Sequence, residues 1–380
     1  LPNSLPRYDR GPFDYKPGEA LSRSWLFFDH APEAGRGDKF EIVNAVYRMR
    51  QSKCYLQSKG TLECGSCHNP HDVPRGEAAR RHYDAACQKC HSPASIATRH
   101  DAGAGKVSGC ADCHMPKRRT EDVVHSLATD HLIQRNQPSG GLTAARAERH
   151  EEGAAAYRGE VVLYYPEQLP ATPASELYLA LAQVIDRSNL EGGIPRLQRA
   201  LAASAPPAAA RMEFYLALAE AWTHRGQLHK ALPVYREAVR RDPRSAFALR
   251  KLGTALRQSG QLGESVALLV KAASMAPKDP LGWHQLGLAY QAQGRAADAA
   301  TAFQKAIALD SDLPEPHSNL GVVRLATGDR AGAEAAFREA IRIRPDYADA
   351  HDNLGTLLAG GGDIQRARQH FEAALRLRPN

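Results

Sequence analysis

Apolar and small residues recur at helical spacing through the C-terminal part of the chain, from about Ala174 onward. These alanine-rich segments have the pattern of amphipathic helices. Comparison of the chain with itself gives a regular period, marked each time by a Leu-Gly pair. The pairs are Leu252-Gly253, Leu286-Gly287, Leu320-Gly321 and Leu354-Gly355. The pattern therefore predicts an array of similar helical units.

Two further positions follow the same period. A small residue recurs at Ala238, Ala272, Ala306, Ala340 and Ala374, and a proline at Pro243, Pro277, Pro345 and Pro379. A period of about 34 residues is typical of tetratricopeptide repeats, in which each helix pair buries its apolar face against the next pair. We expect five repeats over residues 212–380. A degenerate repeat, lengthened by three residues, is expected over residues 174–211.

Residues 1–135 are rich in turns, cysteine and histidine. Their clearest regular element is a predicted helix over Phe40–Ser58, capped by Asp38, with Ile42, Ala45, Val46 and Met49 at helical spacing. Loops and short helices are expected elsewhere. Residues 136–173 contain Gly140, Gly141 and four prolines, and are predicted to form a linker.

The cysteines point to a specific chemistry, because all seven lie between Cys54 and Cys113. Six of them form three Cys-x-x-Cys-His motifs at equal intervals along the chain: Cys64, Cys67 and His68; Cys87, Cys90 and His91; Cys110, Cys113 and His114. This pattern is that of c-type haem attachment. The two cysteines bond the haem vinyl groups, and the adjacent histidine binds the iron. We therefore expect three covalently bound haems c.

Two other interpretations compete with haem. Successive cysteine pairs are separated by about 19 residues, which also fits a zinc ribbon. Chance rarely places a histidine directly after all three pairs, whereas haem attachment requires one there. Structural disulfides would give these histidines no role.

Each iron needs a second axial ligand, and this region has surplus histidines. The candidates are His71, His100, His125 and His131, with His30 and His82 weaker. Methionine is scarce, because only Met49 and Met115 lie here. Bis-histidine ligation is therefore expected, which implies lower redox potentials than His/Met ligation. His317 and His351, which lie in the repeats where an aromatic residue normally packs, are expected to be structural.

Charge and hydropathy exclude some other classes of function. The net charge is +7 and the pI about 9.0, but the basic residues are dispersed and are not interleaved with aromatic residues, so we expect no nucleic-acid partner. The propionates of three haems would add about six negative charges. No apolar run reaches the roughly 18–20 residues that span a bilayer. The chain starts at Leu1 without a signal segment, so any export signal is expected to have been removed or to lie outside it.

Several segments resemble a family of bacterial multihaem cytochromes c fused to tetratricopeptide repeats. They are Tyr15–Glu19, Ser52–Tyr55, Cys64–His71, Cys110–Arg119, His125 and Thr129–His131. The resemblance implies an exported protein, periplasmic or extracellular. Relatives carry further haem motifs upstream of the part that corresponds to this chain. His30, His71 and His100 are therefore also candidates for haems held elsewhere.

The expected fold is mainly α, with a loop-rich multihaem domain over residues 1–135 followed by a tetratricopeptide α-solenoid. The expected function is electron transfer between closely packed haems, with the solenoid docking redox protein partners or further copies of the chain, including as a filament. One alternative is an oxidoreductase with one open haem site. Another is a repeat scaffold with structural haems. Cys54 is expected to be a small buried apolar residue, with a regulatory thiol or an unusual haem contact as alternatives.

Overall fold

The structure is a computed structural model of the chain. It describes residues 4–8, 19, 21–31, 45–59, 61–68, 74–92, 109–120, 126–134, 141–144, 158–165, 168–206 and 210–378. The chain divides into two compact units. The first comprises Leu1–Ser4 and Asp29–Val162, and the second Leu5–Phe28 and Leu163–Asn380.

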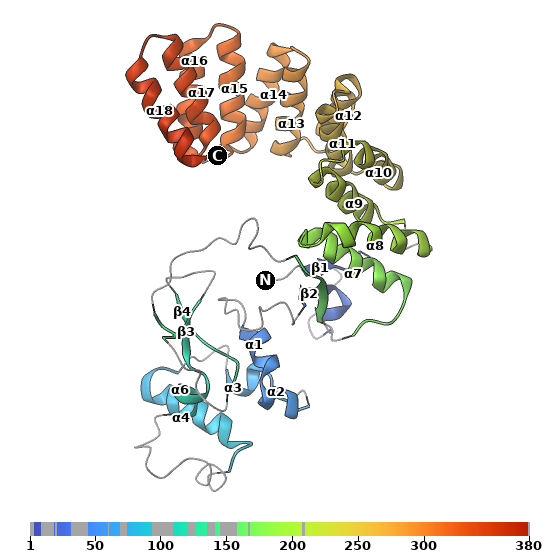
Figure 1. The fold of residues 1–380 in the computed structure, drawn as a ribbon, viewed down its shortest axis with the longest axis vertical. Coiled ribbons are helices and arrows are strands. Elements are labelled where there is room, and N and C mark those ends of the chain that lie inside the picture. Colours follow the sequence, from blue (N-terminus) through green and yellow to red (C-terminus); the bar gives the residue numbers. More distant parts are fainter. Residues whose placement is uncertain are drawn as a thin grey trace. The chain divides into compact units, whose positions relative to one another are not determined.

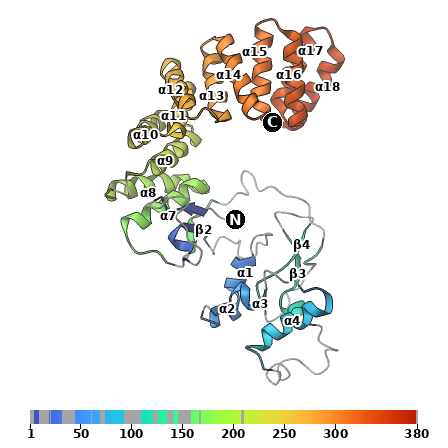
Figure 2. The same cartoon turned by 180° about the vertical axis from the view of Figure 1, so that it is seen from behind.

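Antiparallel helix pairs make up most of the second unit, and both views of the ribbon show them stacked in chain order (Figures 1 and 2). The degenerate repeat is α7 (Pro173–Asp186) with α8 (Leu190–Ala203). The five regular repeats are α9 (Met212–His224) with α10 (Leu228–Arg241), α11 (Ala246–Gln258) with α12 (Leu262–Met275), α13 (Pro280–Ala292) with α14 (Ala296–Leu309), α15 (Pro314–Ala326) with α16 (Arg330–Ile343), and α17 (Ala348–Gly360) with α18 (Ile364–Leu377). The predicted repeat array is thereby confirmed.

The recurring glycine of the Leu-Gly pair allows the two helices of a repeat to approach closely. A Cβ on Gly287 would lie 2.5 Å from the ring of Phe303, and one on Gly321 would lie 2.6 Å from the ring of Phe337. A Cβ on Gly253 would likewise lie 2.7 Å from the Leu269 side chain. The tight turn between the helices is also periodic, because Gly294 (φ 73°) and its equivalents one period away adopt left-handed conformations.

An N-terminal segment packs on the degenerate repeat within the second unit. The Tyr8 ring lies 5.9 Å from the Tyr178 ring and 5.5 Å from the Phe214 ring, and the Tyr8 backbone N–H donates to the Tyr178 hydroxyl at 2.7 Å. Burial raises the pKa of Tyr8 to about 12, with Glu213 contributing further. This packing is not evident from the sequence.

No strand was predicted from the sequence, and three of those in the structure pair with one another. They are β1 (Ser4–Pro6), β2 (Trp25–His30) and β5 (Val161–Tyr165), which form a sheet in the order β1-β2-β5. Leu26 and Phe28 of β2 are buried completely, which accounts for the alternating burial along that strand. A 3-10 turn, η1 (Leu21–Arg23), precedes β2.

The first unit is built from short elements. They are α1 (Ala45–Gln51), α2 (Lys53–Gln57), α3 (Cys64–Cys67), α4 (Gly76–Gln88), α6 (Cys110–His114), β3 (Lys117–Arg119) and β4 (Leu127–Thr129). β3 and β4 pair antiparallel, with Arg118 opposite Ala128.

The prediction of one continuous helix over Phe40–Ser58 is wrong, because the helical conformation is interrupted at Ser52. Ser52 has φ −68° and ψ 143°, and its hydroxyl accepts from the Tyr55 N–H at 3.2 Å, so it is the N-cap of α2. Asp38 and Ile42 lie outside the described residues. Within the described part of the chain, no helix combines the length and the hydropathy needed to cross a membrane.

Candidate metal centre

The first Cys-x-x-Cys-His motif forms a single helical turn, α3. The Glu63 N–H donates to the Ser66 hydroxyl at 3.1 Å at the start of this turn. The His68 N–H donates to the Cys64 carbonyl at 2.8 Å at its end. Cys64 is exposed and Cys67 half-buried. The turn places both sulfurs on one side of the backbone, with the histidine directly after them.

The other two motifs also turn between the first cysteine and the histidine, although His114 lies inside its helix whereas His68 has an extended backbone. Cys87 lies in the last turn of α4, and the N–H groups of Cys90 and His91 donate to its carbonyl at 3.1 and 3.0 Å. Cys110 begins α6, which ends at His114. The side chain of Cys113 is not described. The backbone at all three motifs therefore fits the requirement of haem c, namely two cysteines one turn apart followed by a histidine.

The second and third motifs lie against each other through α4 and α6. The Cys110 N–H donates to the Asp84 carboxylate at 2.6 Å, and Arg80 lies 3.5 Å from Asp112. Burial and the adjacent Asp84 raise the pKa of the Cys110 thiol to about 12. Burial likewise raises the pKa of Cys87, with Cys67 and Asp84 adding to the effect. These thiols are thus protonated at neutral pH. The six described cysteines form no disulfide.

Two of the candidate iron ligands have their Nδ1 atoms on backbone carbonyls. His114 Nδ1 lies 2.6 Å from the Gln134 oxygen, and His131 Nδ1 lies 3.0 Å from the Thr129 oxygen. A carbonyl only accepts, so Nδ1 carries the proton in both rings. In the neutral form of each ring Nε2 is then the unprotonated nitrogen, which is the form that binds a metal. This arrangement supports the assignment of both histidines as ligands.

His68 and His131, which are far apart in sequence, are neighbours in the structure. Their ring centroids are 6.1 Å apart, and Tyr83 lies edge-on to His68 with centroids 5.6 Å apart. Burial lowers the pKa of His68, and the nearby His131 and His82 lower it further. The neutral imidazole, which is the metal-binding form, is therefore favoured at His68.

A buried ion pair lies beside His131 and was not predicted from the sequence. Arg48 donates from Nε and Nη2 to the two carboxylate oxygens of Asp130, at 2.9 and 2.7 Å. Both side chains have no exposed surface, and Arg118 adds a contact of 3.1 Å to the same carboxylate. Three separate segments, α1, β3 and the end of β4, are thereby joined next to a candidate ligand.

The structure describes only some of the remaining predicted site residues. His71, His100 and His125 lie outside the described residues. His30 ends strand β2 and is half-buried. His82, on α4, has its Nε2 2.9 Å from the Cys67 carbonyl oxygen. Cys54 is half-buried rather than fully buried, and burial raises the pKa of its thiol, with Cys90 adding to this.

His317 and His351 have the structural role predicted for them. Trp283 Nε1 donates to the Pro277 carbonyl at 3.0 Å. One and two periods later, Nε2 of His317 and of His351 make the equivalent contacts with the carbonyls of Ser311 and Pro345, at 3.1 and 3.0 Å. Each ring therefore fixes the loop that precedes its own helix.

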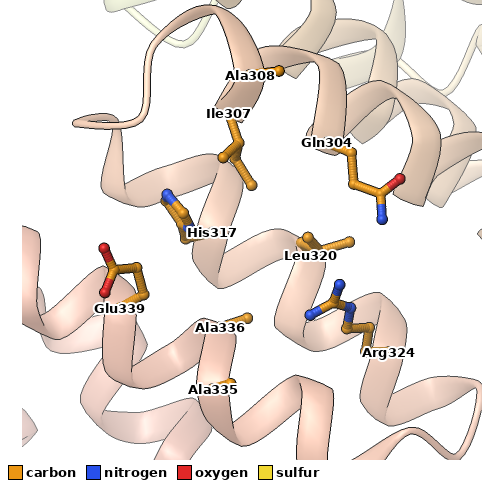
Figure 3. Close-up of a pocket in the computed structure, with 9 residues that line it drawn as sticks. All are labelled: Gln304, Ile307, Ala308, His317, Leu320, Arg324, Ala335, Ala336 and Glu339. Atoms are coloured by element: carbon orange, nitrogen blue, oxygen red, sulfur yellow. The ribbon is translucent and has the colours of Figure 1, made fainter.

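A cavity of about 380 Å³ lies between consecutive repeats. Figure 3 shows His317, Leu320 and Arg324 of α15 lining it, with residues of α14 and α16 around them. Glu339 and Arg324 give it charged groups of both signs, and Ile307 and Leu320 make part of its wall apolar.

Comparisons with known proteins match the repeat region. The family described as "Tetratricopeptide repeat" matches residues 183–246, 224–280 and 318–380, and that described as "TPR repeat" matches residues 292–328. No curated protein matches the chain.

Several solved structures are similar over the same region. PilF of Pseudomonas aeruginosa is 20% identical, with a TM-score of 0.46, over 55% of this chain and 92% of that one. A tetratricopeptide-repeat protein of Thermus thermophilus is 20% identical, with a TM-score of 0.41, over 44% and 92%. MamA of Desulfovibrio magneticus is 19% identical, with a TM-score of 0.39, over 44% and 94%. The family matches and the sequence period identify the C-terminal part of the chain as an array of tetratricopeptide repeats.

Proposed function

We propose that the chain is an exported multihaem c-type cytochrome, periplasmic or extracellular, that transfers electrons and docks protein partners through its repeats. The observation that carries the proposal is the shared backbone of the three Cys-x-x-Cys-His motifs. Each is a helical turn that ends with the histidine one turn after the first cysteine. Haem c attachment needs this arrangement at each site.

The composition of the buried interior supports the same proposal. In the first unit, the buried residues among the described side chains are Arg48, Ser52, Pro116, Thr120, Asp130 and Val161. Most of these are polar. A haem is a large apolar disc, so three of them would supply the apolar interior that these side chains do not. In the second unit, by contrast, buried leucines, alanines and phenylalanines form the core.

Each group has a defined role in this proposal. Cys64, Cys67, Cys87, Cys90, Cys110 and Cys113 hold the three haems, and His68, His91 and His114 bind the irons. A bound haem c supplies a one-electron redox centre. The Gln134 carbonyl holds the proton of His114 on Nδ1, and the Thr129 carbonyl does the same for His131. These contacts fix the orientation of the rings and increase the basicity of Nε2.

The repeats supply the docking function. Tetratricopeptide repeats mediate protein–protein interactions, and stacked helix pairs form extended binding surfaces. The partners that suit a haem protein are electron donors and acceptors. A redox protein bound to the repeats would be kept near the haems, which raises its effective concentration there.

Intact mass under denaturing conditions tests the proposal, because thioether-linked haem stays with the polypeptide. The purified exported protein is expected to exceed the polypeptide mass by three haems. The double variant Cys64→Ser/Cys67→Ser should carry two haems. Cys54→Ser, which removes a cysteine outside the motifs, should keep three. A protein that carries zinc and no haem would refute the cytochrome assignment and leave a repeat scaffold.

A further inference from the structure

We infer that His131 binds the same iron as His68 and is thus the second axial ligand of the haem held by Cys64 and Cys67. The inference rests on the proposed function. Of the surplus histidines in this region, His131 is thereby paired with the iron that His68 binds. The two residues are distant in the sequence, and only the fold brings them together.

The separation of the two rings is of the size that a shared iron requires. An imidazole nitrogen bonds a metal at about 2 Å, so two rings on opposite sides of one metal ion have centroids roughly 6 Å apart. The centroids of His68 and His131 are 6.1 Å apart. His68 follows directly after Cys67, so this space lies beside the sulfurs of the first motif.

His131 is also held in position by its neighbours. Its Nδ1 donates to the Thr129 carbonyl at 3.0 Å, which leaves Nε2 for a metal. The preceding residue, Asp130, is fixed by the buried pair with Arg48, and its Oδ1 accepts from the Leu132 N–H at 2.9 Å. The backbone is therefore fixed on both sides of His131. Such support is typical of metal ligands, whose orientation is set by surrounding contacts.

The nearby His82 is the competing ligand, and its contacts argue against it. The Nε2 of His82 lies 2.9 Å from the Cys67 carbonyl oxygen. A carbonyl can only accept, so this nitrogen carries a proton, and only Nδ1 of His82, the ring nitrogen beside its own Cβ, is left for a metal. Its contact is with the backbone of the motif, whereas the Nδ1 contact of His131 leaves the outer nitrogen of the ring unprotonated.

The decisive variant is His131→Ala in the full haem-loaded chain, with His82→Ala as the matched control. His131→Ala should keep three haems by denaturing mass. One of its three irons should become high-spin and bind one equivalent of cyanide, and added imidazole should restore the low-spin spectrum. His82→Ala should keep the low-spin spectrum of the unchanged protein. His131→Met, which keeps a ligand, should stay low-spin and raise the redox potential of one haem.

A combined variant identifies which haem is affected. In Cys64→Ser/Cys67→Ser, which lacks the first haem, adding His131→Ala should produce no new high-spin iron. A high-spin signal in that combination would overturn the pairing with His68. So would a fully low-spin spectrum for His131→Ala with three haems still attached, and this result would leave the cytochrome assignment intact. Absence of haem from the unchanged protein would instead refute the proposed function itself.

Discussion

The buried pair of Arg48 and Asp130 shows a residue-scale feature that the sequence does not reveal. Charged side chains are rarely buried unless they are paired. The two partners are 82 positions apart, so no local pattern relates them. The proposed attachment motifs, in contrast, are local, and their spacing alone predicts the candidate cysteines and the first candidate histidine ligands. Any second ligand would be brought to its iron by folding over long distances, so the sequence indicates a set of candidates but no pairing.

Substituting one partner of this pair is expected to destabilise the first unit. In Asp130→Asn the Arg48 charge stays buried without its counter-charge, at an expected cost of about 3–5 kcal/mol. Amide hydrogen exchange at Leu132, whose N–H donates to the same side chain, measures the loss.

The control for this variant is an exposed ion pair of the same unit. Arg81 and Glu77 lie 3.5 Å apart with side chains 73% and 83% exposed. Glu77→Gln should change stability by less than about 0.5 kcal/mol. If the Leu132 amide exchanged no faster in Asp130→Asn than in Glu77→Gln, the buried pair would not stabilise this unit.

At the scale of elements, the sequence predicted the helices whose pattern of residues recurs in every repeat. The regular period gives each helix several independent signals, so the pairs α9 to α18 follow from the sequence. The helix over Phe40–Ser58 rested on a single stretch of apolar spacing, and Ser52 interrupts it by capping α2. The strands β1, β2 and β5 have three, six and five residues, too few for an alternating pattern to be recognised.

The glycines of the repeats allow a paired test at this scale. Gly321→Ala would place a Cβ 2.6 Å from the Phe337 ring. Overpacking costs about 1–3 kcal/mol, which exceeds the gain of up to about 1 kcal/mol in helix propensity. Urea unfolding followed by helical circular dichroism should therefore show a lower midpoint.

Gly263→Ala is the matched control for Gly321→Ala. Gly263 also lies in a repeat helix, α12, but a Cβ there would have no atom within 4 Å. This variant should be as stable as the unchanged protein or up to about 1 kcal/mol more stable. Equal midpoints for the two variants would show that the close approach of Phe337 does not explain why residue 321 is a glycine.

At the scale of the whole molecule, the two units differ in what stabilises them. The repeats are stabilised by contacts between neighbouring helices, as in the cluster of Phe337, Leu354 and Phe371. The described buried side chains of the first unit are mostly polar. The second unit should therefore not depend on haem, whereas the first should.

Expression of the full chain without haem attachment tests this difference. The repeat helices should persist, because their cores contain no residue of the three motifs. Limited proteolysis should cut within residues 29–162 and spare residues 168–378, and circular dichroism should retain most of its helical signal. Loss of the helical signal in the haem-free chain would show that the repeats need the first unit to fold.

The contact between each glycine and the aromatic ring of the next helix also bears on how such a chain changes in evolution. Gly287 with Phe303, Gly321 with Phe337 and Gly355 with Phe371 are the same contact displaced by one period. Both partners lie within one repeat, so an in-frame duplication or deletion of a whole repeat leaves every remaining contact of this kind complete. Gly253 faces Leu269 instead, so this copy keeps the close approach without an aromatic ring. The number of repeats, and hence the length of the surface that they form, can therefore vary between descendants without any change to the Cys-x-x-Cys-His motifs.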